Sequence, residues 1–342
     1  MTTNISVSAP GKIILFGEHA VVYDKLGIVY SIDKRCHVRL VPHSKDRFFI
    51  NSDRFGQQGP FSENEISDIY YSQKKLIEDR DFKGLQKLYQ GNRLSPVLFV
   101  AGSIFNKHGF CGADIHVKSQ VPKGLGSSSA LFSALSLALL KQFKQKVSND
   151  EVSSFAYQGD VVAHGGTPSG IDNNAVTHGG CLTYRQSQGV TILKNKSSTL
   201  RLLVVDTGEE PRTAETVARV RQLRKEKPLF VDSVLDRLNF FSEEALGALD
   251  NKPDIKKVGR LMTDYYLELK KLDISTSRID QIIELALKNN ALGAKPTGGW
   301  GGGCCLVLAG NQSERDTLQK TFHNHDFSCF EVKIGGGGVM ET

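Results

Sequence analysis

A glycine- and serine-rich turn, placed directly before an apolar helix, constrains this chain more than any other feature. The stretch runs Pro122-Lys-Gly-Leu-Gly-Ser-Ser-Ser-Ala-Leu131. Gly124 and Gly126 have no Cβ, so the backbone can take left-handed angles and an anion can come close to its N–H groups. Each of the three serines can cap the helix that follows, whose free N–H groups and positive dipole end point at the same place. The stretch therefore predicts a phosphate-binding loop.

The helix predicted from Ala130 to about Phe143 is apolar around nearly its whole circumference, which is typical of a buried central helix. It is shorter than the roughly 20 apolar residues that a membrane span needs. Taken alone, the stretch is equally compatible with an ordinary turn before a core helix. The commoner phosphate loops are not present, because the chain contains neither G-x-x-x-x-G-K-[ST] nor a G-x-G-x-x-G that joins a strand to a helix.

Composition places the chain among soluble globular proteins with about two domains, since it has 342 residues. The net charge of +6 is spread out, and the densest basic segment, residues 219–227, has the spacing of a solvated helix face, so we expect no nucleic-acid partner. The six cysteines form no C-x-x-C pair, which favours reduced thiols. Residues 1–10 lack the basic flank and apolar run of a signal peptide, so we expect a cytoplasmic protein without membrane contact.

Apolar periodicity predicts an alternation of strands and helices in the first half of the chain. We expect strands at 5–9, 12–16, 27–32, 35–41, 112–120 and 181–184, and helices at 65–89 and 96–105. A break at Pro10-Gly11 separates the first two strands. Asn149-Asp150 is expected to cap a further helix that ends at His164-Gly165-Gly166.

The second half of the chain predicts an α+β domain whose helices cover one face of a sheet. We expect strands at 200–206, 304–308 and 327–334, several helices between 213 and 290, and a helix at 313–322. The glycine run 298–303 is expected to be a short tight loop between a helix and a strand. The run 335–338 is expected to be a turn before a last strand.

Four segments together resemble the motifs of one kinase superfamily, in the superfamily's order. They are Ser8-Ala-Pro-Gly-Lys-Ile-Ile-Leu-Phe-Gly-Glu-His-Ala-Val-Val-Tyr23, the loop at 122–131, the segment 164–180 with Thr167-Pro-Ser-Gly-Ile-Asp-Asn173, and Ala294-Lys-Pro-Thr-Gly-Gly-Trp-Gly-Gly-Gly-Cys304. The superfamily is that of the GHMP kinases, named for galactokinase, homoserine kinase, mevalonate kinase and phosphomevalonate kinase. The first segment is similar to the mevalonate branch, because galactokinase-type sequences carry an Arg-rich version.

The resemblance implies an α+β fold of two domains, with a ribosomal protein S5 domain 2-like domain at 1–186 and a ferredoxin-like domain at 187–342. It also implies an ATP-dependent kinase that uses Mg²⁺ and phosphorylates a small alcohol, the 5-hydroxyl of mevalonate being the first candidate. Phosphomevalonate or another substrate of the superfamily is the nearest alternative. A non-catalytic ligand sensor and a decarboxylase of the same fold remain open, as does the oligomeric state, a homodimer included.

Site residues follow from the resemblance, position by position. Asp172 would be the catalytic base, with Lys12 beside it. ATP would be bound by Lys123, Gly124, Leu125, Gly126, Ser127, Ser128 and Ser129, and Mg²⁺ by Ser128 and Asp160. Substrate would be bound by Glu18, His19 and Thr213.

These residue types suit phosphoryl transfer, which asks a protein mainly for positioning and charge neutralisation. A lysine close to Asp172 would keep the base ionised and stabilise developing negative charge. Serine and aspartate oxygens are the hard ligands that Mg²⁺ prefers. A base facing a lysine favours a kinase over a sensor.

Three departures from the superfamily's pattern bear on these assignments. Asp160 stands where a longer Glu is usual, one extra glycine, at 165 or 166, precedes Asp172, and Gly299-Trp300 replaces a smaller pair. The first two departures can offset each other. Trp300, the sole tryptophan, must either pack as a plug or face the cleft.

Overall fold

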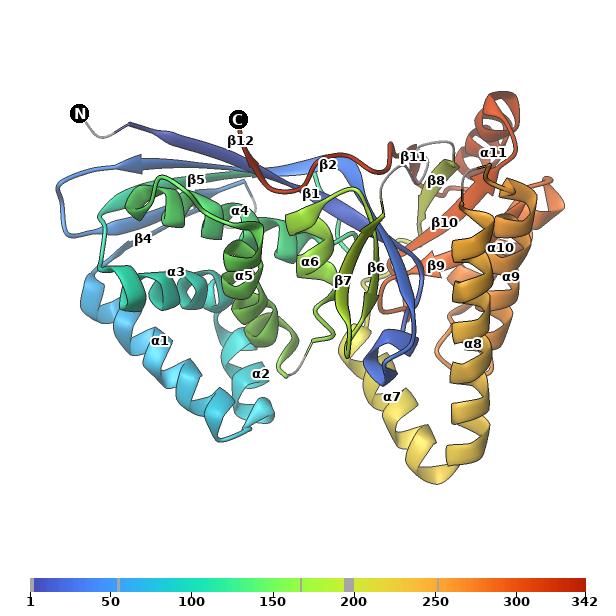
Figure 1. Ribbon diagram of the computed structural model, residues 1–342, viewed down its shortest axis with the longest axis horizontal. Helices are drawn as coiled ribbons and strands as arrows, with labels where there is room; N and C mark the ends of the chain where they lie inside the picture. The colour runs from blue at the N-terminus through green and yellow to red at the C-terminus, as the bar shows by residue number, and fades with distance from the viewer. Residues whose placement is uncertain (1–2, 54–55, 167, 194–199, 251) are drawn as a thin grey trace.

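The structure is a computed structural model that describes residues 3–53, 56–166, 168–193, 200–250 and 252–342. Two sheets organise it, one in each half of the chain (Figure 1). The first half contains β1 (Ile5–Phe16), the 3-10 helix η1 (Ala20–Tyr23), β2 (Gly27–Pro42), β3 (Phe48–Ser52), β4 (Gly56–Phe61), α1 (Glu63–Glu78), α2 (Phe82–Gly91), α3 (Ser95–His108), β5 (Ala113–Ser119), α4 (Ser127–Phe143), α5 (Asn149–His164), α6 (Ile171–His178), β6 (Cys181–Arg185) and β7 (Gly189–Leu193).

The first sheet has the strand order β12-β1-β2-β5-β3-β4, and β6 pairs with both β2 and β7. Its long strands β1 and β2 are continuous, so the predicted breaks inside them are wrong. Pro10-Gly11 is accommodated by a register shift between Pro10 and Lys12 instead of ending the strand. A Cβ at Gly11 would lie 2.7 Å from Val121 Cγ1 and 2.9 Å from the carbonyl oxygen of Leu125. The glycine is therefore required by the close approach of the phosphate loop.

The central helix α4 is buried as predicted, but it begins three residues earlier, at Ser127. Its N-cap is Gly126, whose φ of 79° is left-handed, and no serine side chain caps it. The serines lie instead in the first turn, where their backbone N–H groups are free. The cap of α5 is Ser148, one residue before the predicted Asn149-Asp150.

Two further helix predictions need correction. The helix expected at 65–89 is divided into α1 and α2, because Arg80 has a φ of 56° and the Asp81 side chain caps the second helix at the N–H of Gly84. The sequence predicts no helix at 171–178, and this segment forms the short helix α6.

The second half contains β8 (Arg201–Asp206), α7 (Thr213–Glu226), α8 (Pro228–Ala248), α9 (Ile255–Lys270), α10 (Ser277–Lys288), β9 (Gly293–Thr297), β10 (Cys304–Ala309), α11 (Gln312–Asn324), β11 (Cys329–Glu331) and β12 (Met340–Glu341). Its antiparallel sheet has the order β11-β8-β10-β9, and α9, α10 and α11 pack on it (Figure 1). Strands and helices follow the β-α-β-β-α-β sequence of a ferredoxin-like domain. Strand β9 was not predicted, so the glycine run 298–303 joins two strands and not a helix to a strand.

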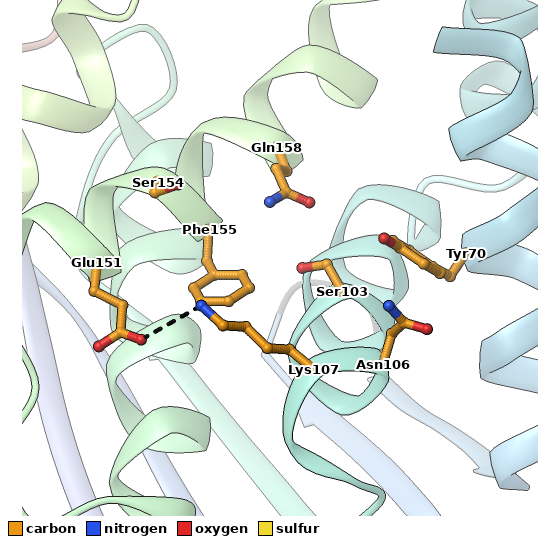
Figure 2. Close-up of a pocket in the computed structure, with 8 residues that line it drawn as sticks. All are labelled: Tyr70, Ser103, Asn106, Lys107, Glu151, Ser154, Phe155 and Gln158. Carbon is orange, nitrogen blue, oxygen red and sulfur yellow. Dashed lines mark ion pairs between the residues drawn. The ribbon is translucent and has the colours of Figure 1, made fainter. Parts of the chain in front are cut away.

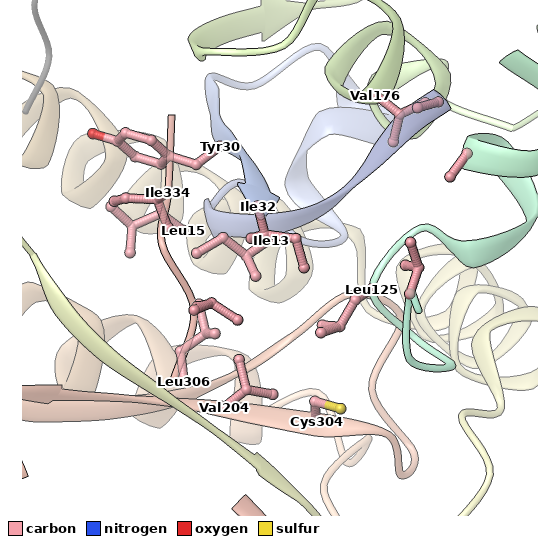
Figure 3. Packing of buried hydrophobic residues seen from close by; sticks show 14 of the residues in the cluster. Ile13, Leu15, Tyr30, Ile32, Leu125, Val176, Val204, Cys304, Leu306 and Ile334 are labelled. Atoms are coloured by element: carbon pink, nitrogen blue, oxygen red, sulfur yellow. The ribbon is translucent and has the colours of Figure 1, made fainter. Parts of the chain in front are cut away.

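The two halves are joined more closely than a linear division suggests. Strand β7 pairs with β6, so the predicted boundary at 186/187 falls inside a hairpin of the first sheet. The chain also returns at its end, where β12 pairs with β1 (Figure 1). One apolar cluster spans both sheets, and in it Ile13, Leu15 and Ile32 lie near Val204, Cys304 and Leu306 (Figure 3). In the described part of the chain, no helix has the length and apolar character that crossing a bilayer requires.

Candidate active site

Lys12 lies where β1 meets the phosphate loop. Its backbone N–H donates a 2.8 Å hydrogen bond to the carbonyl oxygen of Leu125, and its side chain is 2% exposed. The aliphatic stem crosses Gly126, where a Cβ would lie 2.8 Å from Lys12 Cγ. Backbone and side chain of Lys12 are thus both fixed against the loop.

Asp172 faces Lys12, the arrangement that the resemblance to the GHMP kinases implies. Lys12 Nζ lies 3.0 Å from Asp172 Oδ1, and the carboxylate is 30% exposed while the ammonium is buried. Asp172 stands in the first turn of α6, where the helix dipole favours a negative charge. The arrangement gives a carboxylate that is held by a buried cation and is still open to a substrate.

The backbone before Asp172 is held by two tyrosines that the sequence did not single out. Tyr157 on α5 donates a 3.1 Å hydrogen bond to the carbonyl oxygen of Pro168, and Tyr184 on β6 donates a short one to that of Ser169. Thr167, the first residue of this segment, lies outside the described residues. No local pattern marks either tyrosine, because both occupy ordinary positions on a helix and a strand.

Asp160 lies in the last turn and a half of α5 and is 2% exposed. Its carboxylate accepts hydrogen bonds from the Ser129 hydroxyl, at 2.8 Å to Oδ1 and 3.0 Å to Oδ2. The structure therefore joins Asp160 to Ser129, whereas the prediction paired it with Ser128, which is half-buried in the same helical turn. Burial raises the pKa of Asp160 to about 7; nearby His164 opposes this rise and Asp172 adds to it.

Lys123 is the one charged side chain predicted to bind ATP in the loop. It is exposed and pairs with Glu210 of the second half at 2.6 Å. Exposed ion pairs of this kind contribute little to the free energy of folding. Lys123 can therefore exchange Glu210 for another partner.

The turn after β1 contains Glu18 and His19, both buried. Glu18 forms a short ion pair with Lys295 on β9. His19 Nε2 lies 3.1 Å from the carbonyl oxygen of Gly299, and since a carbonyl can only accept, Nε2 carries the proton. Burial lowers the pKa of His19 to about 4, so the ring is neutral at pH 7.

Thr213 begins α7 and packs against the glycine loop 298–303. A Cβ at Gly299 would lie 2.0 Å from Thr213 Oγ1, so only glycine fits there. The neighbouring Thr216 donates a 2.6 Å hydrogen bond to the carbonyl oxygen of Gly299. Because His19 bonds the same oxygen, the structure brings the predicted substrate residues His19 and Thr213 to one loop.

This glycine loop contacts the phosphate loop, and Thr297, the last residue of β9 before it, contacts β1. The Thr297 hydroxyl accepts from the N–H of Ile14 at 3.0 Å and lies 3.1 Å from the carbonyl oxygen of the same residue. A Cβ on Gly298 would lie 3.4 Å from the carbonyl oxygen of Gly124. Residues predicted from three separate motifs therefore meet at one place.

Trp300 packs as a plug and does not face a cleft. It is fully buried and stacks on Tyr266 with ring centroids 6.0 Å apart. Its φ of 65° is left-handed, which a bulky residue adopts only when packing holds it there.

We expect Trp300→Ala to lower the free energy of unfolding by about 3–5 kcal/mol, because it empties the space of a fully buried aromatic ring. Trp300→Phe should cost clearly less, since most of the contact with Tyr266 remains. Urea unfolding followed by circular dichroism measures both. A loss below about 1 kcal/mol in the alanine variant would show that the ring is not a packing element.

A groove of about 480 Å³ lies elsewhere, between α1, α3 and α5 (Figure 2). It is lined by Tyr70, Ser103, Asn106, Lys107, Glu151, Ser154, Phe155 and Gln158. None of these belongs to the four motifs. Gln158 is two residues from Asp160, which on a helix places it about 200° around the axis. The groove is therefore on the other side of α5 from the site described above.

Comparison with known proteins gives the family of this chain. The family model described as the GHMP kinases N terminal domain matches residues 96–180, and that of the GHMP kinases C terminal matches residues 244–327. A mevalonate kinase of Pyrococcus horikoshii is 30% identical over 100% of this chain and 96% of its own length. The crystal structure of the Methanococcus jannaschii mevalonate kinase has a TM-score of 0.81 at 23% identity and covers 98% of this chain and 99% of that one. That of L. major mevalonate kinase in complex with R-mevalonate has a TM-score of 0.74 at 23% identity, with 98% and 97% covered.

The chain belongs to the GHMP kinases and, among them, to the family of the mevalonate kinases. The predicted two-domain GHMP fold is thereby confirmed. The roles of the individual site residues stay predictions.

Proposed function

We propose that this chain transfers the γ-phosphate of ATP to the 5-hydroxyl of mevalonate. The observation that carries the proposal is the 3.0 Å pair of Lys12 and Asp172 beside the free N–H groups that begin α4. The full-length similarity to curated mevalonate kinases supports the choice of substrate, as does the relative whose structure contains R-mevalonate.

Each part of the site then has one task. The backbone N–H groups of Gly124 and of Gly126 to Ser128 bind the β- and γ-phosphates, while that of Leu125 donates to the carbonyl oxygen of Pro122. Asp172 accepts the proton of the attacking hydroxyl, and Lys12 neutralises charge that develops on the transferred group. Glu18, His19 and Thr213 bind the substrate acid, with His19 as a neutral hydrogen-bonding ring.

The residues at Asp160 fit a magnesium ion. Among the described residues no three His, Cys, Asp or Glu side chains gather as a metal cluster. Mg²⁺ usually takes one or two carboxylates and completes its shell with phosphate oxygens and water, which a single buried aspartate next to serines allows. Asp160 and Ser128 would hold it, with Ser129 orienting the carboxylate. When bound, the ion would neutralise charge on the phosphates.

A pH-dependent Mg²⁺ requirement follows from Asp160. Its carboxyl group, with a pKa of about 7, is protonated at pH 6 and mostly ionised at pH 8. Because a metal ligand must be deprotonated, we expect the Mg²⁺ concentration for half-maximal rate to rise about tenfold from pH 8 to pH 6. Steady-state rates at fixed ATP measure this.

Asp160→Ala should raise the Mg²⁺ requirement and remove its pH dependence. Ser128→Ala should raise it with the pH dependence kept. Ser136→Ala, on the same helix and two turns further on, is the control and should match the wild type. An unaltered Mg²⁺ requirement in Asp160→Ala would mean that this carboxylate only holds α4 against α5, through its hydrogen bonds with Ser129.

A coupled ADP-release assay tests the proposed activity directly. Mevalonate, phosphomevalonate, homoserine and galactose are compared at saturating MgATP. We expect kcat/KM for mevalonate to exceed that for each of the others by at least about 10²-fold, since unpaired buried polar groups penalise a wrong substrate. If another alcohol is turned over in preference to mevalonate, that alcohol is the substrate of this chain. Absence of turnover with all four compounds would favour a ligand sensor.

The cytoplasmic location and a homodimeric assembly complete the proposal. Cell fractionation tests the first, and size-exclusion chromatography with light scattering tests the second.

A further inference from the structure

Glu18 and Lys295 form an ion pair with no solvent exposure on either side chain. Lys295 Nζ also donates to the carbonyl oxygen of Pro296 at 2.8 Å and reaches that of Ile14 at 3.5 Å. An ammonium group has three N–H donors, so all three are engaged. Lys295 therefore has no donor left for a substrate.

The ion pair is not expected to add much to the free energy of folding. Taking two charges out of water costs free energy that their attraction repays only when the remaining polar atoms are satisfied. Glu18 Oε2 is buried and finds no hydrogen-bond partner among the described residues. Burial raises the pKa of Glu18 and lowers that of Lys295, and each charge opposes the shift of the other. Because one buried carboxylate oxygen has no hydrogen-bond partner, packing alone does not explain why this pair is present.

Its place in the chain suggests one. Glu18 follows β1, which contains Lys12, and Lys295 lies on β9, three residues before the glycine loop 298–303. The pair therefore joins the first motif in one half of the molecule to the last motif in the other.

Besides the backbone hydrogen bonds from Ala20, Val21 and Val22, contacts from the second half reach each residue of the turn at 17–19. The Tyr265 hydroxyl accepts from the N–H of Gly17 and donates to the carbonyl oxygen of Glu18, each at 3.1 Å. His19 reaches Gly299 at 3.1 Å. His19 also has a φ of 59°, an angle that is unfavourable for residues other than glycine. Surrounding contacts must therefore maintain it. Of these contacts, only the one from Lys295 is an ion pair.

We propose that Lys295 is a positioning residue for the phosphoryl transfer, acting through Glu18 to hold the turn at 17–19 against the second half of the molecule. The proposal rests on the proposed function for its effect on substrate, since the turn contains Glu18 and His19. Lys12 also has contacts of its own, with Leu125 and Asp172, so we expect the substrate side of the site to depend on Lys295 more than the nucleotide side does.

Lys295→Met, which removes the charge and keeps the length, is the test variant. Lys25→Met is the matched control, because Lys25 also joins the two halves, through a 2.6 Å pair with Asp236 on α8, but is partly exposed. Two measurements are made on full-length protein. Steady-state kinetics gives KM for mevalonate and for ATP, and hydrogen exchange with mass spectrometry reports the backbone amides of residues 17–22.

In Lys295→Met we expect KM for mevalonate to rise about tenfold or more, which corresponds to the loss of one charge-assisted hydrogen bond. KM for ATP should stay within about twofold. Amides of 17–22 should exchange about tenfold faster or more, while those of β8 and β10 stay protected. Lys25→Met should match the wild type in both measurements. Loss of folded fraction alone would instead lower kcat, leave both KM values unchanged and raise exchange throughout.

If Lys295→Met does not fold, Glu18→Gln with Lys295→Met removes both charges at similar volume, a change that buried pairs often tolerate. It should fold and show the same faster exchange at 17–22. Wild-type exchange at 17–22 in any folded variant without Lys295 overturns the proposal. A wild-type chain inactive on mevalonate would contradict the proposed function, and the exchange result would still decide the role of Lys295.

Discussion

Asp172→Asn is expected to lower kcat by about 10²- to 10⁴-fold, the range typical of a lost general base, with KM for ATP changed little. The amide keeps the shape of the carboxylate but cannot accept the proton of the substrate hydroxyl. The effect is expected to be large because the Asp172 carboxylate is partly exposed to a substrate and lies 3.0 Å from a buried lysine. Single-turnover measurements at saturating MgATP isolate the chemical step from product release.

Asp150→Asn is the matched control for this variant. Asp150 occupies the same kind of position, the first turn of a helix, but its carboxylate is 91% exposed on α5. It should leave kcat within about twofold, because surface substitutions of this kind change little. An Asp172→Asn enzyme that retains more than about a tenth of wild-type kcat would exclude Asp172 as the base.

Lys12→Met is expected to lower kcat by about 10²- to 10³-fold, which is the loss measured when one preorganised electrostatic group is removed from a developing charge. The methionine can follow the course of the lysine stem over Gly126, so the fold should persist. The backbone bond from residue 12 to Leu125 is also unaffected, so the phosphate loop should keep its place and KM for ATP should change little.

Lys118→Met, on the exposed side of β5, controls for the loss of one positive charge from the first sheet. It should match the wild type. A Lys12→Met enzyme with unchanged kcat and a raised KM for ATP would assign Lys12 to ground-state binding of phosphate and not to the transfer step.

The local chemistry of the motifs could be predicted from the sequence because it depends on neighbouring residues. Gly124 and Gly126 both have positive φ, and α4 begins directly after them, so the loop and its helix need no long-range information. The pairing of Lys12 with Asp172 is different. Its two residues are 160 positions apart, and only the resemblance to a known family connected them.

Secondary structure was mispredicted where tertiary contacts override local signals. Pro10-Gly11 is a typical break, yet β1 continues through it because the phosphate loop needs the open side of Gly11. Strand β9 contains a lysine and a proline and shows no alternation, since all five of its residues are buried. Its lysine is neutralised by Glu18, which lies 277 residues away.

The supporting contacts of the site could not be predicted for the same reason. Ser129 and Ser128 are equivalent in the sequence, and only the packing of α4 on α5 decides which hydroxyl meets Asp160. Tyr157 and Tyr184 hold the backbone before Asp172 through hydroxyl groups that carry no local signature. The sequence allows two roles for Trp300, and its stacking on Tyr266 identifies it as a packing residue.

Identifying the bond that forms on mevalonate tests the proposed phosphoryl transfer most directly. Mevalonate offers a primary 5-hydroxyl, a tertiary 3-hydroxyl and a carboxylate, and phosphate on each gives a different phosphorus spectrum. Wild-type protein with MgATP and mevalonate should produce a phosphomonoester whose ³¹P signal is split into a triplet by the two protons on C5, with one ADP formed per ester. A phosphorus signal without that splitting, or ADP formed without any phosphorylated mevalonate, would contradict transfer to the 5-hydroxyl.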